Sequence, residues 1–562
     1  MRLSCLAAAA ALLLAGLSCA PDRPPVVQLE GDTLVGETVG LLIVVDGLGA
    51  DTFESLQRQG RLPNITRYLI DRGVTVRRAA DSLPTITYPN NVSMVTGTLP
   101  GRHGIMGNKW FDRYSLTLQD YTELRAYRRV DEDFSPQTIF ECLHEDFTAT
   151  VLLPVRRGAT RNIDNWASAG IAWFLGDQPA VNHQVANRFE LISRLANLSG
   201  RWPRFTLAYF ATPDTVGHRR GIDDEGYIDI LVDVDRQVGN ICQSLRQAGL
   251  LEKTVVCLVS DHGFTNTPNH RDMRAFFQNE LGIESREHIY GRDNPLEDRV
   301  AHFGSSRAVV VVNGDRRCDL HLRTGPHWFE RPSAQEIESF VSRFAQRRLP
   351  HLSGGDGVPT LSQMLLAMPC TDLLTIRHGD NEVEVASRTG RAIIGRQCNP
   401  DGKTYSYQVA SGGDPLGYDR FPQAAALCDG LCHSQDAWRQ GTMDTYRPGA
   451  VPSLMELNDS PRCGDVAMFA AEGWDFGRAN AGGHGGLTRQ EMFVPFIWAG
   501  PGLPAGACLD GGWTVDTMPT MMELIGRGAK IPAGLDGKSI AARLRAAAPA
   551  GGAAPASAPA GN

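Results

Sequence analysis

The sequence has no surplus of positive charge and very little lysine. Its 562 residues include 55 Lys and Arg against 63 Asp and Glu, a formal net charge of −8, and only five of the basic residues are Lys. Proteins that bind nucleic acid duplexes rely on a basic surplus to neutralise phosphates, so this class of partner is excluded as the main one. Because 42% of the residues are hydrophobic and 21% are charged, the chain is expected to fold.

Long apolar runs are also missing. The run over residues 6–17 is shorter than the ~20 residues that a membrane-spanning helix needs. It follows Arg2 and precedes small residues, which predicts a secretory signal peptide over residues 1–20. Cleavage would follow Ala20, or Cys19 would carry the lipid of a bacterial lipoprotein. We therefore expect an exported protein, periplasmic or lipid-anchored, whose membrane attachment is limited to a possible anchor at Cys19.

No pair of CxxC motifs occurs, which argues against a zinc–thiolate site. Ten cysteines follow Cys19, and an even number in an exported chain predicts disulfides. Six of them lie between residues 318 and 463. We expect them to staple a region that is rich in loops.

Three apolar runs end in an aspartate. GLLIVVD ends at Asp46, FTLAYFATPD at Asp214 and TVVCLVSD at Asp261, and helical patterns near residues 52–72 and 224–248 follow the first two. Continuous apolar runs that alternate with helices predict a doubly wound, mostly parallel α/β sheet flanked by helices. Ligands bind such sheets at the carboxyl ends of the strands. One aspartate there would be an ordinary turn former, but three on one edge predict a site.

Histidines accompany these aspartates. His218 follows Asp214 by four residues, His262 follows Asp261 directly, and His484 lies in a glycine-rich AGGHGG loop. Three carboxylates and three imidazoles suit two zinc-like ions with open positions for a substrate. Two such ions about 4 Å apart stabilise the attacking and leaving oxygens of a displacement at phosphorus. The expected ligands are Asp46, Asp214, His218, Asp261, His262 and His484.

A nucleophile is expected in the stretch LPTITYPNNVSMVTGTLPGRHGIMGN. Thr87 lies between a proline-containing turn and an expected helix start, with Pro89 in the first helical turn. Exposed backbone amides at a helix N-terminus favour a bound phosphate, and a hydroxyl beside it needs a base or a metal to become nucleophilic. The alternative is that Thr87 or Thr85 merely caps the helix.

The motifs IVVDGLG, PTITYPN, HGIMGN, PDTVGH, SDHGF and GGHGG occur in this order along the chain. Together they resemble the alkaline phosphatase superfamily, and most closely its type I phosphodiesterase and nucleotide pyrophosphatase branch. The resemblance implies two divalent metal ions, expected to be zinc, held by seven residues. One ion would be held by Asp214, His218 and His484, and the other by Asp46, Asp261, His262 and the Thr87 hydroxyl.

The resemblance also implies a chemistry. Thr87 would be phosphorylated transiently, and Asn108 of the HGIMGN motif would hydrogen-bond a phosphoryl oxygen. Tyr88 occupies the place where nucleotide-cleaving relatives stack an aromatic ring on the base. We therefore expect a metal-dependent phosphoric ester hydrolase that acts on a small-molecule phosphate ester, with a phosphodiesterase or nucleotide pyrophosphatase favoured.

Other functions stay open from the sequence alone. A phosphomonoesterase such as an alkaline phosphatase needs an additional cation near the phosphoryl oxygens, and Lys109, Arg156 and Arg157 would be candidates for it. A phosphonoacetate-type hydrolase would cleave a carbon–phosphorus bond with the same metal site. From a different class, a surface protein could keep the fold for metal binding without catalysis.

The signal peptide would lead into a linker over residues 21–39. A catalytic α/β core would form in two parts, over residues 40–264 and 466–543. Residues 265–465 would be an insertion, of which one part completes the sheet and the rest forms a cap beside the active edge. The Ala-, Pro- and Gly-rich residues 544–562 predict a disordered tail.

Overall fold

The computed structural model describes residues 37–549, apart from 124–126, 154, 164–171, 173–175, 200–201, 285–290, 342–358 and 401. The expected signal peptide, Cys19 and most of the linker lie outside these residues. Within them, every helix is too short or too polar to cross a bilayer.

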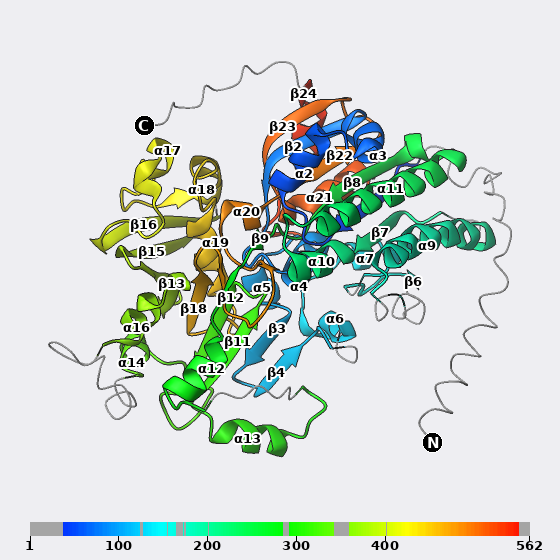
Figure 1. Ribbon diagram of the computed structural model, residues 1–562. Coiled ribbons are helices and arrows are strands. Elements are labelled where there is room, and N and C mark those ends of the chain that lie inside the picture. Colours follow the sequence, from blue (N-terminus) through cyan, green and yellow to red (C-terminus); the bar gives the residue numbers. More distant parts are fainter. Residues whose placement is uncertain are drawn as a thin grey trace, which may run out of the picture.

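A central, mostly parallel sheet carries the elements that the sequence predicted (Figure 1). β1 (Val39–Val45) runs parallel to β7 (Phe205–Phe210) on one side and to β8 (Thr254–Val259) on the other. β22 (Phe496–Ala499) joins antiparallel to β8 and connects it to β2 (Gly73–Ala80). The remaining strands of this sheet are β5 (Thr148–Val151), β6 (Arg161–Ile163), β21 (Phe493–Val494), β23 (Ala507–Trp513) and β24 (Ala548–Pro549).

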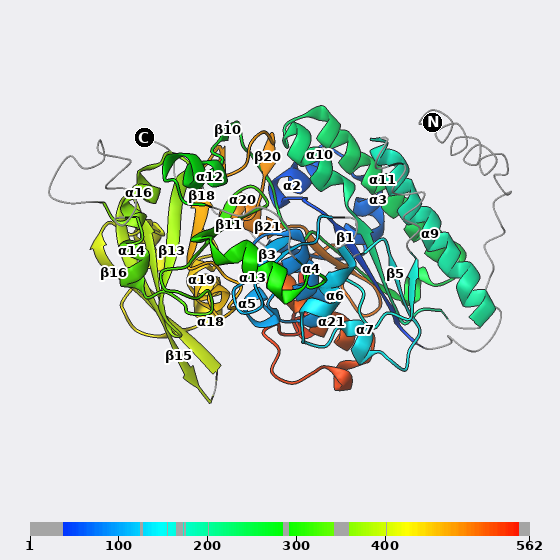
Figure 2. The ribbon, with the colours of Figure 1, turned by 90° about the horizontal axis from the view of Figure 1, so that it is seen from below.

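Helices cover both faces of the central sheet, so the predicted doubly wound α/β fold is confirmed (Figure 2). Side chains of β1 alternate between two apolar clusters, with Leu42 in one and Ile43 in the other. Both residues are fully buried because each face has its own helical layer. The helices on the Ile43 side are α2 (Ala50–Arg58), α9 (Gln178–Ser199) and α11 (Glu225–Gln247); those on the Leu42 side include α4 (Thr87–Thr96) and α21 (Thr517–Leu524).

Two boundaries of this region differ from expectation. The single helix expected near residues 52–72 is divided into α2, α3 (Pro63–Ile65) and the π-helical turn η2 (Thr66–Ile70). Gly60 adopts a left-handed φ of 70° and Pro63 starts the next turn, so the chain bends between them. The tail expected from residue 544 also begins with structure, since β24 pairs with β23 at the sheet edge.

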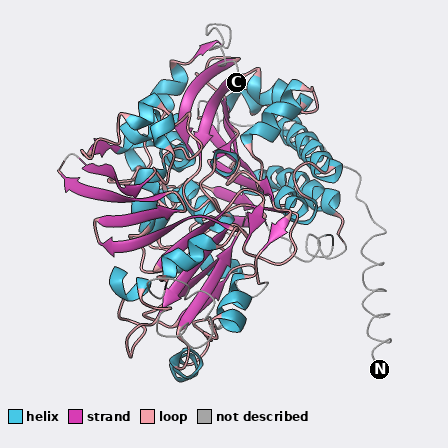
Figure 3. Ribbon diagram, turned by 60° about the vertical axis from the view of Figure 1, so that its left-hand side comes forward, coloured by secondary structure: helices cyan, strands magenta, loops and turns pink. Residues whose placement is uncertain are grey.

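A second sheet forms beside the central one and is antiparallel (Figure 3). We expected part of residues 265–465 to complete the central sheet. This is wrong for the described residues, because each strand of this insertion that is part of a large sheet lies in the second sheet. β18, which lies after residue 465, also belongs to it. The strands are β11 (Ala308–Asn313), β12 (Arg317–Leu322), β18 (Val466–Ala470), β13 (Thr371–Gly379), β14 (Glu382–Ser387), β15 (Gly390–Asn399), β16 (Gly402–Gly412) and β17 (His433–Ser434).

Short helices and small two-stranded sheets fill the spaces around the two large sheets. The helices near the second sheet are α12 (Met273–Ala275), α13 (Leu296–Gly304), α14 (Ala334–Glu338), α16 (Leu361–Ala367), α17 (Pro422–Ala425), α18 (Gln435–Gly441) and α19 (Ala450–Leu457). The small sheets pair β3 (Lys109–Asp112) with β4 (Thr117–Asp120), β9 (Thr265–Asn266) with β20 (Gly482–Gly483), and β10 (Asn269–His270) with β19 (Trp474–Asp475).

The expected disulfides are wrong. All ten cysteines after Cys19 are free thiols. Cys318, Cys370 and Cys463, which we expected to staple loops, are buried among apolar side chains instead. They act as small core residues, a common role for a free cysteine.

Candidate active site

The predicted site residues come from separate elements that meet at one edge of the central sheet. Asp46 follows β1 directly, and Asp261 lies two residues after the neighbouring β8. We expected Asp214 at a strand end, but β7 stops at Phe210, and Asp214 lies in the first turn of α10 (Thr212–Arg220). His218 is therefore one helical turn after Asp214, and His484 enters from the loop between β20 and α20 (Arg489–Met492).

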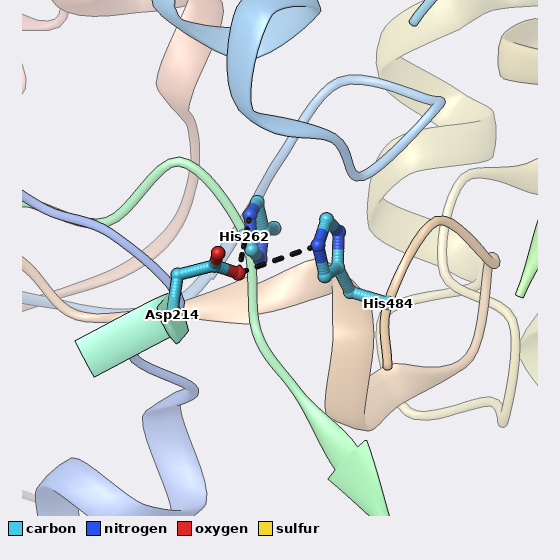
Figure 4. Close-up of side chains that lie close together, drawn as sticks. All are labelled: Asp214, His262 and His484. Atoms are coloured by element: carbon cyan, nitrogen blue, oxygen red, sulfur yellow. Dashed lines mark ion pairs between the residues drawn. The ribbon is translucent and has the colours of Figure 1, made fainter. Parts of the chain in front are cut away.

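Asp214, His218 and His484 converge on one point. The Asp214 Oδ1 atom is 3.4 Å from His218 Nε2 and 3.4 Å from His484 Nε2. The two imidazole Nε2 atoms are 3.2 Å apart. Figure 4 shows the approach of Asp214 to His484 and to the neighbouring His262.

Asp46, His262 and Thr87 form a second group beside the first. His262 Nε2 lies 3.2 Å from Asp46 Oδ1 and 3.4 Å from the Thr87 hydroxyl. Asp261 places a carboxylate oxygen within 4.8 Å of the ligand atoms of Asp46 and His262. The rings of His262 and His484 stack with centroids 3.6 Å apart, so the two groups adjoin.

The protonation of the three histidines is decided by backbone carbonyls. Each Nδ1 faces a carbonyl oxygen, which only accepts hydrogen bonds: that of Gly482 for His218, Gly263 for His262 and Thr85 for His484, at 2.8–3.0 Å. The proton of each neutral ring is therefore on Nδ1, and the Nε2 lone pairs point at the carboxylates and at one another. Nitrogen lone pairs and carboxylate oxygens that face each other repel one another, and a cation between them removes this repulsion.

These residues fit metal ions in two further respects. Oδ1 of Asp46 and Oδ1 of Asp214 are buried and accept no hydrogen bond from the described residues. Nitrogen and oxygen atoms at about 2.0–2.2 Å from one tetrahedral ion stand about 3.3–3.6 Å apart, close to the observed spacing of 3.2–3.4 Å. The donor set is that of zinc or a similar divalent ion.

Negative charge accumulates among buried groups of the site. Burial, followed by the charge of Asp214, raises the pKa of Asp46 to about 8. Burial and the charge of Asp46 raise the pKa of Asp261 well above its usual range. Against the effect of burial, the carboxylates of Asp214 and Asp315 raise the pKa of His218 to about 9. Each shift has the sign that favours a cation in the site.

Thr87 is the first residue of α4 and is almost wholly buried. No side chain caps this helix, so a capping role for Thr87 or Thr85 is wrong. The Thr85 hydroxyl instead donates a hydrogen bond to the carbonyl of Gly486 in the His484 loop. The Asn108 amide oxygen accepts a hydrogen bond of 3.2 Å from the Tyr88 N–H, which holds Asn108 beside the start of α4.

The Tyr88 side chain has a packing role in this structure. Its ring lies 4.9 Å from that of Tyr121, its hydroxyl donates a hydrogen bond to the Tyr121 carbonyl, and only 8% of the residue is exposed. The three candidate cations for a monoester are also occupied. Lys109 pairs with Asp120, Arg156 with Asp131 and Arg157 with Glu141.

Two residues that orient the site were missed from the sequence. The Asn91 side-chain amide donates hydrogen bonds of 2.9 Å to Asp261 Oδ2 and to the Thr87 carbonyl. Its position four residues after Thr87 in the expected helix was an available signal. The Tyr209 hydroxyl donates to Asp46 Oδ2, and a tyrosine within the buried run FTLAYF needs such a partner.

The chain is similar to known proteins in sequence and in fold. The profile of the family described as type I phosphodiesterase / nucleotide pyrophosphatase matches residues 40–331, more than half of the chain. Bis(5'-adenosyl)-triphosphatase enpp4 of Xenopus laevis is 26% identical over 234 residues, which are 41% of this chain and 48% of that protein. The chain thus matches about half the length of this relative.

Solved structures match over nearly the whole chain. Murine ectonucleotide pyrophosphatase / phosphodiesterase 5 superposes with a TM-score of 0.54 at 14% identity, covering 91% of this chain and 99% of its own. An inactive threonine-to-alanine variant of that protein, in complex with AMP, superposes with the same coverage, TM-score and identity. At this identity the match establishes the fold alone.

Proposed function

Because the chain belongs to the type I phosphodiesterase / nucleotide pyrophosphatase family, we propose that it hydrolyses phosphodiester or pyrophosphate bonds of small nucleotide-like substrates. The observation that carries the proposal is the convergence of three imidazole Nε2 atoms on buried carboxylates beside the Thr87 hydroxyl. This arrangement of nitrogen and oxygen atoms suits metal ions, and the Thr87 hydroxyl lies beside them, where it can react.

Two ions would be held by the two groups of side chains. When bound, they supply positive charge that stabilises the phosphoryl oxygens and the leaving oxygen during displacement. Tyr209 holds Oδ2 of Asp46, which keeps its Oδ1 turned toward the site, and Asn91 holds the carboxylate of Asp261. The ligands proposed are Asp214, His218 and His484 for one ion, and Asp46, Asp261, His262 and Thr87 for the other.

Thr87 is the proposed nucleophile. Its oxygen attacks phosphorus and loses its proton, the bond from phosphorus to the leaving oxygen breaks, and a phosphothreonine forms. Water then attacks phosphorus, the bond to Thr87 breaks, and the hydroxyl regains a proton. The N-terminus of the ten-residue helix α4 favours the phosphoryl anion. With its oxygen held by the Tyr88 N–H, Asn108 is oriented to donate its amide hydrogens to a phosphoryl oxygen.

A diester or pyrophosphate substrate is favoured over a monoester. A monoester dianion carries more charge and needs a further cation near its oxygens. Lys109, Arg156 and Arg157 are each paired with a carboxylate, so they do not offer a spare positive charge. The name of the Xenopus relative and the AMP complex of the murine neighbour support an adenine nucleotide as the first substrate to test. Stacking of Tyr88 on the base stays a prediction.

The test is a hydrolysis panel with purified, zinc-loaded protein. We expect bis-aryl phosphate and bis(5'-adenosyl) triphosphate to be cleaved faster than aryl phosphate and phosphonoacetate, and chelator to abolish turnover. Thr87→Ala is expected to lower turnover by roughly 10⁴-fold or more, as for other enzymes without their nucleophile. Thr96→Ala, at the far end of the same helix, is the matched control and is expected to keep activity.

Other outcomes would replace the proposal. Fastest cleavage of aryl phosphate would indicate a phosphomonoesterase, and fastest cleavage of phosphonoacetate a phosphonate hydrolase. Full turnover by Thr87→Ala would contradict the covalent mechanism. No turnover of any substrate by protein that binds two ions would favour a non-catalytic metal-binding role.

Export is proposed from the first 20 residues alone. Fractionation of cells that express the full chain, with and without Cys19→Ala, tests it. Release of the variant from membranes into the periplasm is expected if Cys19 is lipidated. Retention of the wild-type protein in the cytoplasm would contradict export.

A further inference from the structure

The turn between β11 and β12 reaches from the second sheet into the active site. Asp315 and His484 form an isolated parallel bridge, in which the His484 N–H donates to the Gly314 carbonyl at 2.7 Å and the Arg316 N–H donates to the His484 carbonyl at 3.1 Å. The turn therefore holds a residue that we assign as a metal ligand by both of its backbone polar groups. His484 cannot shift along its loop without breaking this pairing.

Asp315 approaches a second ligand with its side chain. Its Oδ2 atom lies 3.4 Å from His218 Nδ1, the ring atom opposite the one that faces Asp214 and His484. Asn480 donates a hydrogen bond of 2.5 Å to the same oxygen, which fixes the carboxylate in this position. The same Nδ1–H also faces a backbone carbonyl at 2.9 Å, so the carboxylate is its second acceptor. A carboxylate behind the Nδ1–H of a metal-binding histidine orients the ring and makes the ligand nitrogen more basic.

Asn313 acts on a different part of the site. Its side-chain oxygen accepts a hydrogen bond of 2.9 Å from the Lys109 N–H, and its amide donates one of 2.9 Å to the Lys109 carbonyl. Lys109 follows Asn108 directly. Asn313 is 2% exposed, and a Cβ on Gly107 would lie only 2.4 Å from its oxygen. The backbone on both sides of Asn108 thus rests against this one side chain.

We propose that the turn residues Asn313–Arg316 are a positioning element of the active site, in which Asp315 orients His218 and Asn313 orients Asn108. This rests on the proposed function, because it assumes that His218 binds a metal ion and that Asn108 binds a phosphoryl oxygen. The second sheet then completes the site through this turn, although the metal ligands themselves come from the central region.

The substitution that tests Asp315 is Asp315→Asn in the full chain. Asp315 has a left-handed φ of 65°, which asparagine also tolerates, so the turn keeps its shape while the charge is lost. Competition with a chelator measures the affinity of both zinc ions without a substrate. We expect one of the two sites to weaken about 10–100-fold and the other to stay unchanged. Asp380→Asn, an exposed aspartate of the second sheet region, is the matched control.

Binding of inorganic phosphate tests the role of Asn313. We expect Asn313→Ala to leave both zinc affinities unchanged and to weaken binding of inorganic phosphate about 10-fold, the loss of a hydrogen bond to a charged group. Unchanged zinc affinities also report that the variant is folded. Asn313→Asp, which keeps the acceptor for the Lys109 N–H, is expected to restore part of the phosphate affinity.

The results separate this inference from the proposed function. Wild-type zinc affinities at both sites in Asp315→Asn, or wild-type phosphate affinity in Asn313→Ala, would overturn the corresponding half of the inference. If the variants behave as expected but the wild-type protein hydrolyses none of the panel, the inference stands and the proposed function fails.

Discussion

The two sheets of this protein bury their strands in different ways. Every residue of β1, β7 and β8 is buried, because helices cover both faces of the central sheet. In the second sheet, β11, β12 and β18 are also buried almost throughout, whereas the first halves of β15 and β16 alternate between more buried and more exposed residues, and the far ends of β15 and β16 are exposed. The strands β1, β7 and β8 therefore appear in the sequence as unbroken apolar runs, whereas β15 and β16 do not.

This difference explains where the chemistry lies. Helices cover both faces of these parallel strands, so a ligand can reach the sheet only at the strand ends. Polar residues such as Asp46 and Asp261 therefore gather at one edge. The second sheet contributes to the site through the turn at Asp315, which pairs with His484 and approaches His218.

The largest expected effect is the stabilisation of the site and its surroundings by metal ions. Zinc at 100 times its dissociation constant is expected to raise the free energy of unfolding by about 2.7 kcal/mol for each ion that binds only the folded state. Denaturant titration with and without chelator measures this. Hydrogen exchange should show new protection near Asp46, Asp261 and His484 and none in β15 and β16. Equal new protection from hydrogen exchange in both sheets would contradict this difference between them.

Core substitutions compare the two patterns of burial directly. Leu42→Ala and Ile43→Ala are each expected to cost about 2–5 kcal/mol in free energy of unfolding, because these adjacent residues fill opposite cores. In β16, Tyr407→Ala should also be costly, but its exposed neighbour Gln408→Ala should change stability by less than about 0.5 kcal/mol. A small cost for either β1 variant would contradict burial on both faces.

Acid should destabilise the central region through His103. The buried ring accepts a hydrogen bond from the Ile105 N–H on Nδ1, and burial lowers its pKa to about 3. An unfolded histidine has a pKa near 6.5, so the unfolded state binds a proton first. The contribution of His103 is complete above pH 6.5 and is lost as the pH falls from 6.5 toward 3, by about 1.4 kcal/mol per pH unit.

The measurement is the free energy of unfolding from pH 7 to pH 5 for the wild-type protein and His103→Asn. The asparagine oxygen retains an acceptor for the Ile105 N–H but does not titrate in this range. We expect a shallower pH dependence in the variant, by about one proton. Identical slopes would show that His103 is not held neutral.

The smallest expected effect is that of a reductant on the second sheet region. All described cysteines are free, so dithiothreitol should leave the melting temperature unchanged. Each disulfide, if present, would contribute about 2–4 kcal/mol, so a clear drop in melting temperature would contradict the free thiols of Cys318, Cys370 and Cys463.

Local pattern was enough to predict much of the central region. The apolar runs before Asp46 and Asp261 and the helix over 225–247 appear where periodicity put them. The helix expected near 52–72 was broken because a glycine and a proline outweigh periodicity within one turn. Cysteine counting failed because pairing depends on distance in the fold, and three of these thiols are core residues.

What the sequence determined by itself is the set of candidate site residues and the sheet that carries them. Asp46, Asp261 and His262 are recognisable because they follow apolar strands, Asp214 and His218 because they are four residues apart, and His484 because it lies in a glycine-rich loop. Tertiary structure alone decided that the carbonyls of Gly482 and Thr85 receive the Nδ1–H of His218 and His484, and that the turn at Asp315 reaches both histidines. The physical reason is range: strand and helix patterns arise from neighbours along the chain, whereas these contacts join residues that lie far apart in the sequence.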